Sequence, residues 1–100
     1  MPYQSKLQSS DLDRLFEAIL TLESVEEVYR FMEDLTTIQE IKEMGQRFHV
    51  AQLLDKKLPY QKIAETTSAS TATISRVNKS LVYGAGGYRL ALDRLKKDSK

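Results

Sequence analysis

Apolar residues recur along most of the chain with a period near 3.6 and almost never alternate with polar ones. This pattern is typical of amphipathic helices that bury one face. Between residues 10 and 57 it predicts three helices with these apolar stripes: Leu12, Leu15, Phe16, Ile19 and Leu20; Val25, Val28, Tyr29, Met32 and Leu35; and Ile38, Ile41, Met44, Phe48 and Ala51. The sequence therefore predicts an all-α protein.

Capping residues support these three helices. Each predicted helix begins with a serine or threonine followed three residues later by an acidic residue, which is typical of a helix N-terminus. The pairs are Ser10 with Asp13, Ser24 with Glu27, and Thr37 with Glu40. The third helix extends to about Leu54, and Pro59 ends it because the residue before a proline disfavours helical backbone.

Beyond Pro59 the predicted helices become short. Residues 60–67 allow only about two turns, with Ile63 and Ala64 facing inward. Ser70 is a suitable cap for a helix from Thr71 to Lys79 or Ser80. The glycines of residues 84–87 follow no predicted strand and lack the Lys-Ser/Thr ending of a phosphate-binding loop, so we expect a helix end and hinge there. A last helix over residues 86–97 completes about six helices.

Residues 59–81 have the spacing of a helix-turn-helix. Ser68 occupies the tight-turn position where glycine is more usual, and Ile74, Val77 and Leu81 form the inward stripe of the second helix. Small hydroxyls near the start of that helix suit base edges, whereas arginine and lysine suit phosphates. We expect DNA contacts from Gln61, Lys62, Ser70, Thr71, Ala72, Ser75, Arg76 and Lys79.

Composition narrows the classes of function. With 100 residues the chain is at most one domain of ordinary size. It has no cysteine, which excludes disulfides and thiolate metal sites, and His49 is its only histidine. No apolar run approaches the roughly 18–20 residues of a membrane span. We therefore expect a cytoplasmic protein that does not interact with membranes.

The net charge of +1 conceals an asymmetry between the two halves. Residues 1–50 carry five cations and ten anions, whereas residues 51–100 carry ten cations and four anions. A basic half that coincides with a helix-turn-helix favours a nucleic-acid partner. The alternative is a helical adaptor whose acidic half binds a basic protein, with the helix-turn-helix as scaffold. We do not expect an enzyme, because His49 has no neighbouring nucleophile.

Two groups of motifs carry a family resemblance. Leu35-Thr-Thr-Ile, Met44-Gly-Gln-Arg-Phe and Ala72-Thr-Ile-Ser-Arg resemble the Trp-repressor superfamily. Leu22-Glu-Ser-Val-Glu-Glu-Val-Tyr-Arg-Phe and the segment from Tyr88 to Arg94 resemble its YerC/YecD-type branch. The resemblance covers roughly residues 10–95. It implies an intertwined homodimer in which residues 10–57 and 86–97 form the shared core. Two helix-turn-helix heads would read a palindromic operator in double-stranded DNA. The implied role is that of a transcriptional regulator, most simply a repressor.

The same resemblance raises the question of a corepressor. It places Arg47 and Arg76 where tryptophan-responsive members hold the indole between two arginines, and Thr37, Thr73 and Ser80 at the smaller polar positions. Val77 stands where those members have a glycine, so its side chain would fill the space of the indole. We therefore expect no tryptophan cofactor. Binding of a smaller effector is one remaining alternative. In the other, Arg47 binds no effector and is merely solvated or ion-paired with Glu43, four residues earlier.

Overall fold

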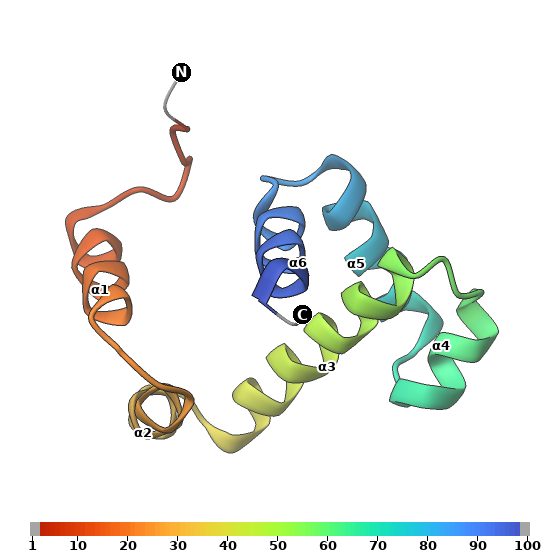
Figure 1. The fold of residues 1–100 in the computed structure, drawn as a ribbon, viewed down its shortest axis with the longest axis horizontal. Helices are drawn as coiled ribbons and strands as arrows, with labels where there is room; N and C mark the ends of the chain where they lie inside the picture. The colour runs from red at the N-terminus through yellow and green to blue at the C-terminus, as the bar shows by residue number, and fades with distance from the viewer. Residues whose placement is uncertain (1–2, 99–100) are drawn as a thin grey trace. The chain divides into compact units, whose positions relative to one another are not determined.

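The computed structural model describes residues 3–98, and within them it contains six α-helices and no strand (Figure 1). The helices are α1 Ser10–Leu20, α2 Val25–Leu35, α3 Ile38–Asp55, α4 Tyr60–Thr67, α5 Thr71–Tyr83 and α6 Gly87–Asp98. The all-α prediction is therefore confirmed. The chain forms two compact units, of which the first ends at Ile38 and the second begins at Gln39. The expected dimerisation part, residues 10–57, thus extends over both units.

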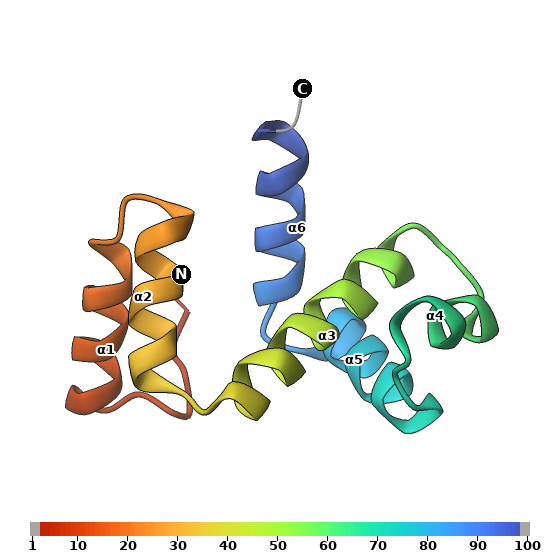
Figure 2. The same ribbon diagram turned by 90° about the horizontal axis from the view of Figure 1, so that it is seen from below.

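The first unit is an antiparallel pair of helices, α1 and α2, joined by residues 21–24 (Figure 2). Ser9, and not the predicted Ser10, caps α1: its Oγ accepts a hydrogen bond from the Leu12 N–H at 3.1 Å. Ser10 is already helical, whereas Ser9 has the extended backbone that a capping residue needs. The predicted Ser24 cap is present, since its Oγ accepts from the Glu27 N–H at 3.2 Å.

The helices of the first unit bury none of their residues. Leu20 is 83% exposed and Val25 is 74% exposed, although both belong to the predicted apolar stripes. Helix formation here rests on the caps and on the acidic residues in the first turn of each helix, where the helix dipole favours negative charge. Two helices with such exposed apolar faces lack a core of their own.

The second unit has a small apolar core to which α3, α4, α5 and α6 all contribute. Its buried residues are Val50, Ala51, Leu53, Ile63, Ala69, Ile74, Val77 and Leu92. The predicted stripe of α3 was partly wrong, because Val50 is fully buried and Ile38 is 75% exposed. The buried residues of α3 all lie in its C-terminal half, where it packs in the core with the helix-turn-helix and α6, so burial follows those neighbours and not one continuous stripe.

Helix α5 ends later than its apolar pattern predicts. It continues to Tyr83 instead of stopping at Lys79 or Ser80, although Val82 and Tyr83 are both exposed. Gly84 ends it: the Gly84 N–H donates to the Ser80 carbonyl at 2.8 Å, and a Cβ at position 84 would overlap that oxygen. The glycine stretch is thus a helix end, as predicted.

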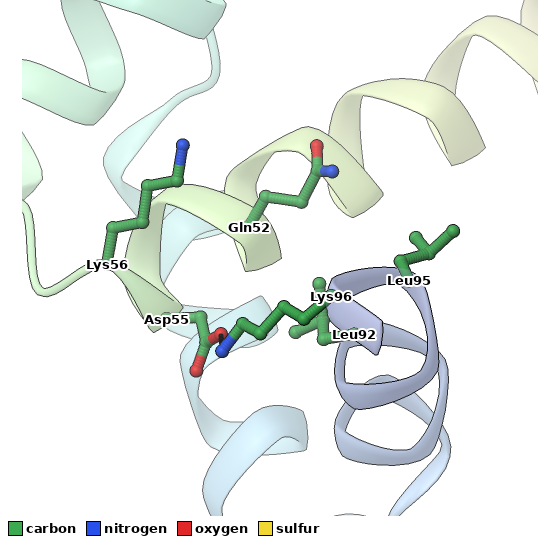
Figure 3. Close-up of a pocket in the computed structure, with 6 residues that line it drawn as sticks. All are labelled: Gln52, Asp55, Lys56, Leu92, Leu95 and Lys96. Atoms are coloured by element: carbon green, nitrogen blue, oxygen red, sulfur yellow. Dashed lines mark ion pairs between the residues drawn. The ribbon is translucent and has the colours of Figure 1, made fainter. Parts of the chain in front are cut away.

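Helix α6 attaches to α3 through an aromatic contact, a leucine and ion pairs. The rings of Phe48 and Tyr88 stack with centroids 6.4 Å apart, and Leu92 is buried. Figure 3 shows the other end of this contact, where Lys96 of α6 extends to Asp55 of α3. A cavity of about 350 Å³ lies there, lined by Gln52, Asp55, Lys56, Leu92, Leu95 and Lys96.

Candidate nucleic-acid interface

The turn between α4 and α5 is closed by hydrogen bonds within the segment. Ser68 has left-handed backbone with φ of 63°, and its N–H donates to the Ala64 carbonyl at 2.9 Å. Thr67 Oγ1 accepts from the Ala69 N–H at 3.1 Å. Ala69 is buried, so the turn is packed as well as hydrogen-bonded. These contacts define the direction in which α5 leaves the turn.

Ser70 caps the start of α5, as the sequence predicts. Its Oγ accepts from the Thr73 N–H at 3.1 Å and donates to Thr73 Oγ1 at 3.1 Å. The hydroxyl of Ser70 is therefore engaged within the chain, although the residue is exposed. A capped first turn holds the N-terminal residues of α5 in fixed helical geometry, which suits a helix that presents its N-terminus to DNA.

Three buried side chains determine which face of α5 points outward. Ile63 of α4 is fully buried, and so are Ile74 and Val77 of α5. Because α5 turns about 100° per residue, the opposite face is left to solvent. The predicted DNA-contacting residues are all exposed: Gln61, Lys62, Ser70, Thr71, Ala72, Ser75, Arg76 and Lys79.

The charge of this outward face is positive. Helix α5 contains no acidic residue, and it carries Arg76 and Lys79. Among residues 3–98, no ion pair engages Lys62, Arg76 or Lys79. Unpaired cations beside small hydroxyl side chains form the combination that contacts phosphates and base edges. Helices α4 and α5 thus present an exposed face that combines unpaired cations with small hydroxyl side chains.

A polar cavity of about 210 Å³ adjoins this face. Three of the five residues predicted for an effector pocket line it, namely Arg47, Thr73 and Arg76. Ser80 is exposed on α5 and does not line it, and neither does Thr37, which belongs to the first unit. Val77 is 1% exposed within the core, so its side chain occupies the interior.

Glu43 and Gln46 complete the lining of this cavity. Glu43 was expected only as an ion-pair partner of Arg47, and no local pattern pointed to Gln46. Arg47 forms no ion pair with Glu43 in the described part of the chain, so the ion-paired alternative was wrong, whereas a merely solvated Arg47 stays a prediction. The Glu43 carboxylate instead accepts from Gln39 Nε2 at 3.0 Å. Gln46 Nε2 donates to the Thr67 carbonyl at 3.1 Å, across 21 residues of sequence.

The only histidine and the acidic side chains were the remaining candidates for catalysis or metal binding. His49 is exposed on α3. Among the residues that the structure describes, no group of three or more histidine, cysteine, aspartate or glutamate side chains could hold a metal ion. No helix in the described ranges is both long and apolar enough to cross a bilayer.

Comparison with known proteins identifies the family. The sequence model of the Trp repressor protein family matches residues 10–96. The uncharacterised protein YerC of Bacillus subtilis (strain 168) is 51% identical over 92 residues, which is 92% of this chain and 88% of YerC. The match extends through both compact units and includes the helix-turn-helix.

Solved structures agree. A TrpR-like protein from Eubacterium eligens ATCC 27750 superimposes with a TM-score of 0.87 at 50% identity, over 91% of this chain and 94% of that one. A candidate Trp repressor from Staphylococcus aureus superimposes with a TM-score of 0.87 at 47% identity, over 91% of each chain. The all-α fold is thus Trp-repressor-like, and the chain belongs to the Trp repressor family as a YerC-type member.

Proposed function

We propose that this chain is a sequence-specific DNA-binding transcriptional regulator that represses by occupying operator DNA as a homodimer in the cytoplasm. The observation that carries the proposal is the outward face of α5. There Arg76 and Lys79 are exposed without ion-pair partners, next to Thr71, Ala72 and Ser75. Membership of the Trp repressor family also supports a DNA-binding regulator.

The residues of this face divide into two roles. Arg76 and Lys79 position the protein by contacting phosphates, whereas Thr71 and Ser75 read base edges. Arg76→Ala or Lys79→Ala should therefore weaken binding to every duplex and reduce the salt dependence of binding by about one ion per lost contact. Changes at Thr71 or Ser75 should alter the preference among duplexes. Gel shifts on a set of related duplexes separate the two roles, and equal behaviour of both pairs would contradict the division.

Arg94→Ala is the matched control for these charge changes. Arg94 is an exposed arginine of α6 that forms no ion pair among the described residues. Arg94→Ala removes the same charge as Arg76→Ala, but Arg94 lies outside the helix-turn-helix. If both variants lose the same affinity, the effect reflects net charge and not the reading head.

A second copy of the chain would cover the apolar faces that α1 and α2 leave exposed. The most exposed residues of these faces are Leu20, Val25 and Tyr29, at 83%, 74% and 66%. Several large apolar side chains this exposed on two neighbouring helices are unusual for a monomer and typical of an interface. Sedimentation equilibrium at micromolar concentration should give twice the mass of the chain. A folded monomer would contradict the dimer.

Selection of bound duplexes from a random DNA pool tests the function itself. A symmetric dimer with two reading heads should enrich a palindrome whose half-sites lie about 10–10.5 base pairs apart. Failure to enrich any duplex would contradict the proposed function and favour the helical adaptor. Phosphate contacts demand a steep loss of duplex affinity as the salt concentration rises, whereas an adaptor should show no duplex binding to lose.

An effector, where one acts, would occupy the cavity lined by Arg47, Thr73 and Arg76. Both arginines are donors that suit a carboxylate or phosphate, and Arg76 also belongs to the outward face of α5. The lining is polar, and the Val77 side chain is buried in the core. We propose a small anionic effector and not tryptophan for this cavity.

A further inference from the structure

We propose that Gln46 is a positioning residue that holds the helix-turn-helix at a fixed angle to α3, and so determines the affinity of the reading head for DNA. This inference rests on the DNA-binding function proposed above. It starts from the hydrogen bond that Gln46 Nε2 donates to the Thr67 carbonyl at 3.1 Å. Gln46 belongs to α3 and is not one of the predicted DNA-contacting residues, although it lines the adjoining cavity with Thr73 and Arg76.

The acceptor of this hydrogen bond lies at the end of a helix. Thr67 is the last residue of α4, and the carbonyls of a last turn have no partner within their own helix. Of these last-turn carbonyls, Ala64 accepts from the Ser68 N–H, while the Thr66 and Thr67 hydroxyls donate one turn back to the Lys62 and Ile63 carbonyls. The Thr67 carbonyl instead accepts from α3, so this bond ties the turn to another element.

The hydrogen bond between Gln46 and Thr67 lies next to the turn that orients α5, so a small movement of this turn would shift the DNA-contacting face. Ser68, Ala69 and Ser70 follow Thr67 directly, and Ser70 caps α5. The strained φ of 63° at Ser68 makes the turn costly to maintain without support. Apolar packing of Ile63 against α5 resists separation of the helices, but it constrains their rotation less than a directional hydrogen bond does. Gln46 therefore determines the orientation of the helix-turn-helix relative to α3, whereas the apolar core provides most of the packing between these helices.

Gln46→Met tests the proposal, because methionine has nearly the same length and helix preference but no N–H to donate. Gln52→Met is the matched control. Gln52 is a half-buried glutamine of the same helix, and it lines the cavity beside α6 instead of facing the turn. Two measurements are made on each full-length variant: the Kd for a selected operator over a range of salt, and amide hydrogen exchange at Ser68, Ala69, Ile74 and Val77.

For Gln46→Met we expect a Kd raised about three- to tenfold, the equivalent of one lost hydrogen bond, with an unchanged salt slope because no phosphate contact is lost. Exchange should accelerate at Ser68 and Ala69 but not at Ile74 and Val77 in the core. Gln52→Met should change neither measurement. An unchanged Kd, a reduced salt slope, or equal acceleration at turn and core amides would overturn the proposal.

These outcomes are distinct from failure of the proposed function. If the unaltered chain binds no duplex, the regulator proposal fails, and exchange at Ser68 and Ala69 then decides by itself whether Gln46 holds the turn. If the unaltered chain binds but Gln46→Met binds equally well, the regulator proposal stands and Gln46 has no positioning role.

Discussion

The carboxylate of Asp55, at the end of α3, lies 2.6 Å from the ammonium of Lys96 in α6 and 2.8 Å from the guanidinium of Arg89. The side chain of Asp55 is only 10% exposed, whereas both cations are well exposed. One shielded carboxylate thus joins the C-terminal helix to the helix that supports the reading head. Charge-assisted hydrogen bonds are the stronger kind, and a shielded acceptor is screened least.

Replacing Asp55 should loosen α6. Asp55→Asn keeps the shape of the side chain but removes the charge, so we expect the free energy of unfolding to fall by about 1–2 kcal/mol. Asp93→Asn is the control, because Asp93 pairs with Arg89 at 3.2 Å within α6 and is 54% exposed. Asp93→Asn should lower the free energy of unfolding by about 0.5 kcal/mol or less. Urea unfolding measures both, and equal losses would contradict a special role for Asp55.

Acid should weaken the same contact. Hydrogen bonds from Lys96 and then from Arg89 hold the pKa of Asp55 below its ordinary value of 3.8. Because the pKa is lowered on folding, the stabilisation is fully present above the unfolded pKa and is lost as the pH falls through the folded one. The difference in unfolding free energy between the native chain and Asp55→Asn should stay constant from pH 7 to about pH 5 and shrink below about pH 4. A difference that is independent of pH would contradict this.

The left-handed turn at Ser68 should favour glycine. A side chain at φ of 63° costs free energy that glycine avoids, although glycine also loses more entropy on folding. We therefore expect Ser68→Gly to raise the free energy of unfolding by about 0.5–1 kcal/mol. Thermal unfolding measures it. At Gly86, where φ is 87°, Gly86→Ala should shift stability in the opposite direction. A destabilised Ser68→Gly variant would show that its hydroxyl matters more than the backbone strain.

Loss of the Ser70 cap should destabilise α5. Ser70→Ala removes the acceptor of the Thr73 N–H, and we expect a loss of about 1 kcal/mol. Ser75→Ala is the control, since Ser75 is exposed in the same helix and makes no hydrogen bond with its side chain among the described residues. It should change stability by less than about 0.5 kcal/mol. Chemical denaturation that finds the two variants equal would contradict the capping role.

Val77 should be essential for the core and incompatible with an indole. Val77→Ala removes buried methyl groups, so stability should fall by about 1–3 kcal/mol. Calorimetric titration of the unaltered chain with L-tryptophan should give no binding heat, because a buried valine, Val77, stands where tryptophan-responsive members have a glycine. Saturable binding of L-tryptophan would overturn this expectation.

Local pattern alone determined much of this protein. The 3.6-residue period predicted the helices and an inward Ile74 and Val77, because a helix buries one stripe wherever it lies. The capping residue types predicted the Ser24 and Ser70 caps, because a helix must satisfy its own termini. The outward position of Arg76 and Lys79 followed from the same geometry. Cap position was less certain, since Ser9 and Ser10 are chemically identical and only backbone geometry separates them.

The tertiary structure decided everything that depends on contacts distant in sequence. It buried Val50 and exposed Ile38, brought Asp55 to Arg89 and Lys96, and placed Gln46 against Thr67. No local pattern encodes these pairs, because the partners lie on different helices and meet only when those helices pack. The periodicity of one helix defines which of its faces is apolar, whereas the neighbour that covers that face is defined by the fold.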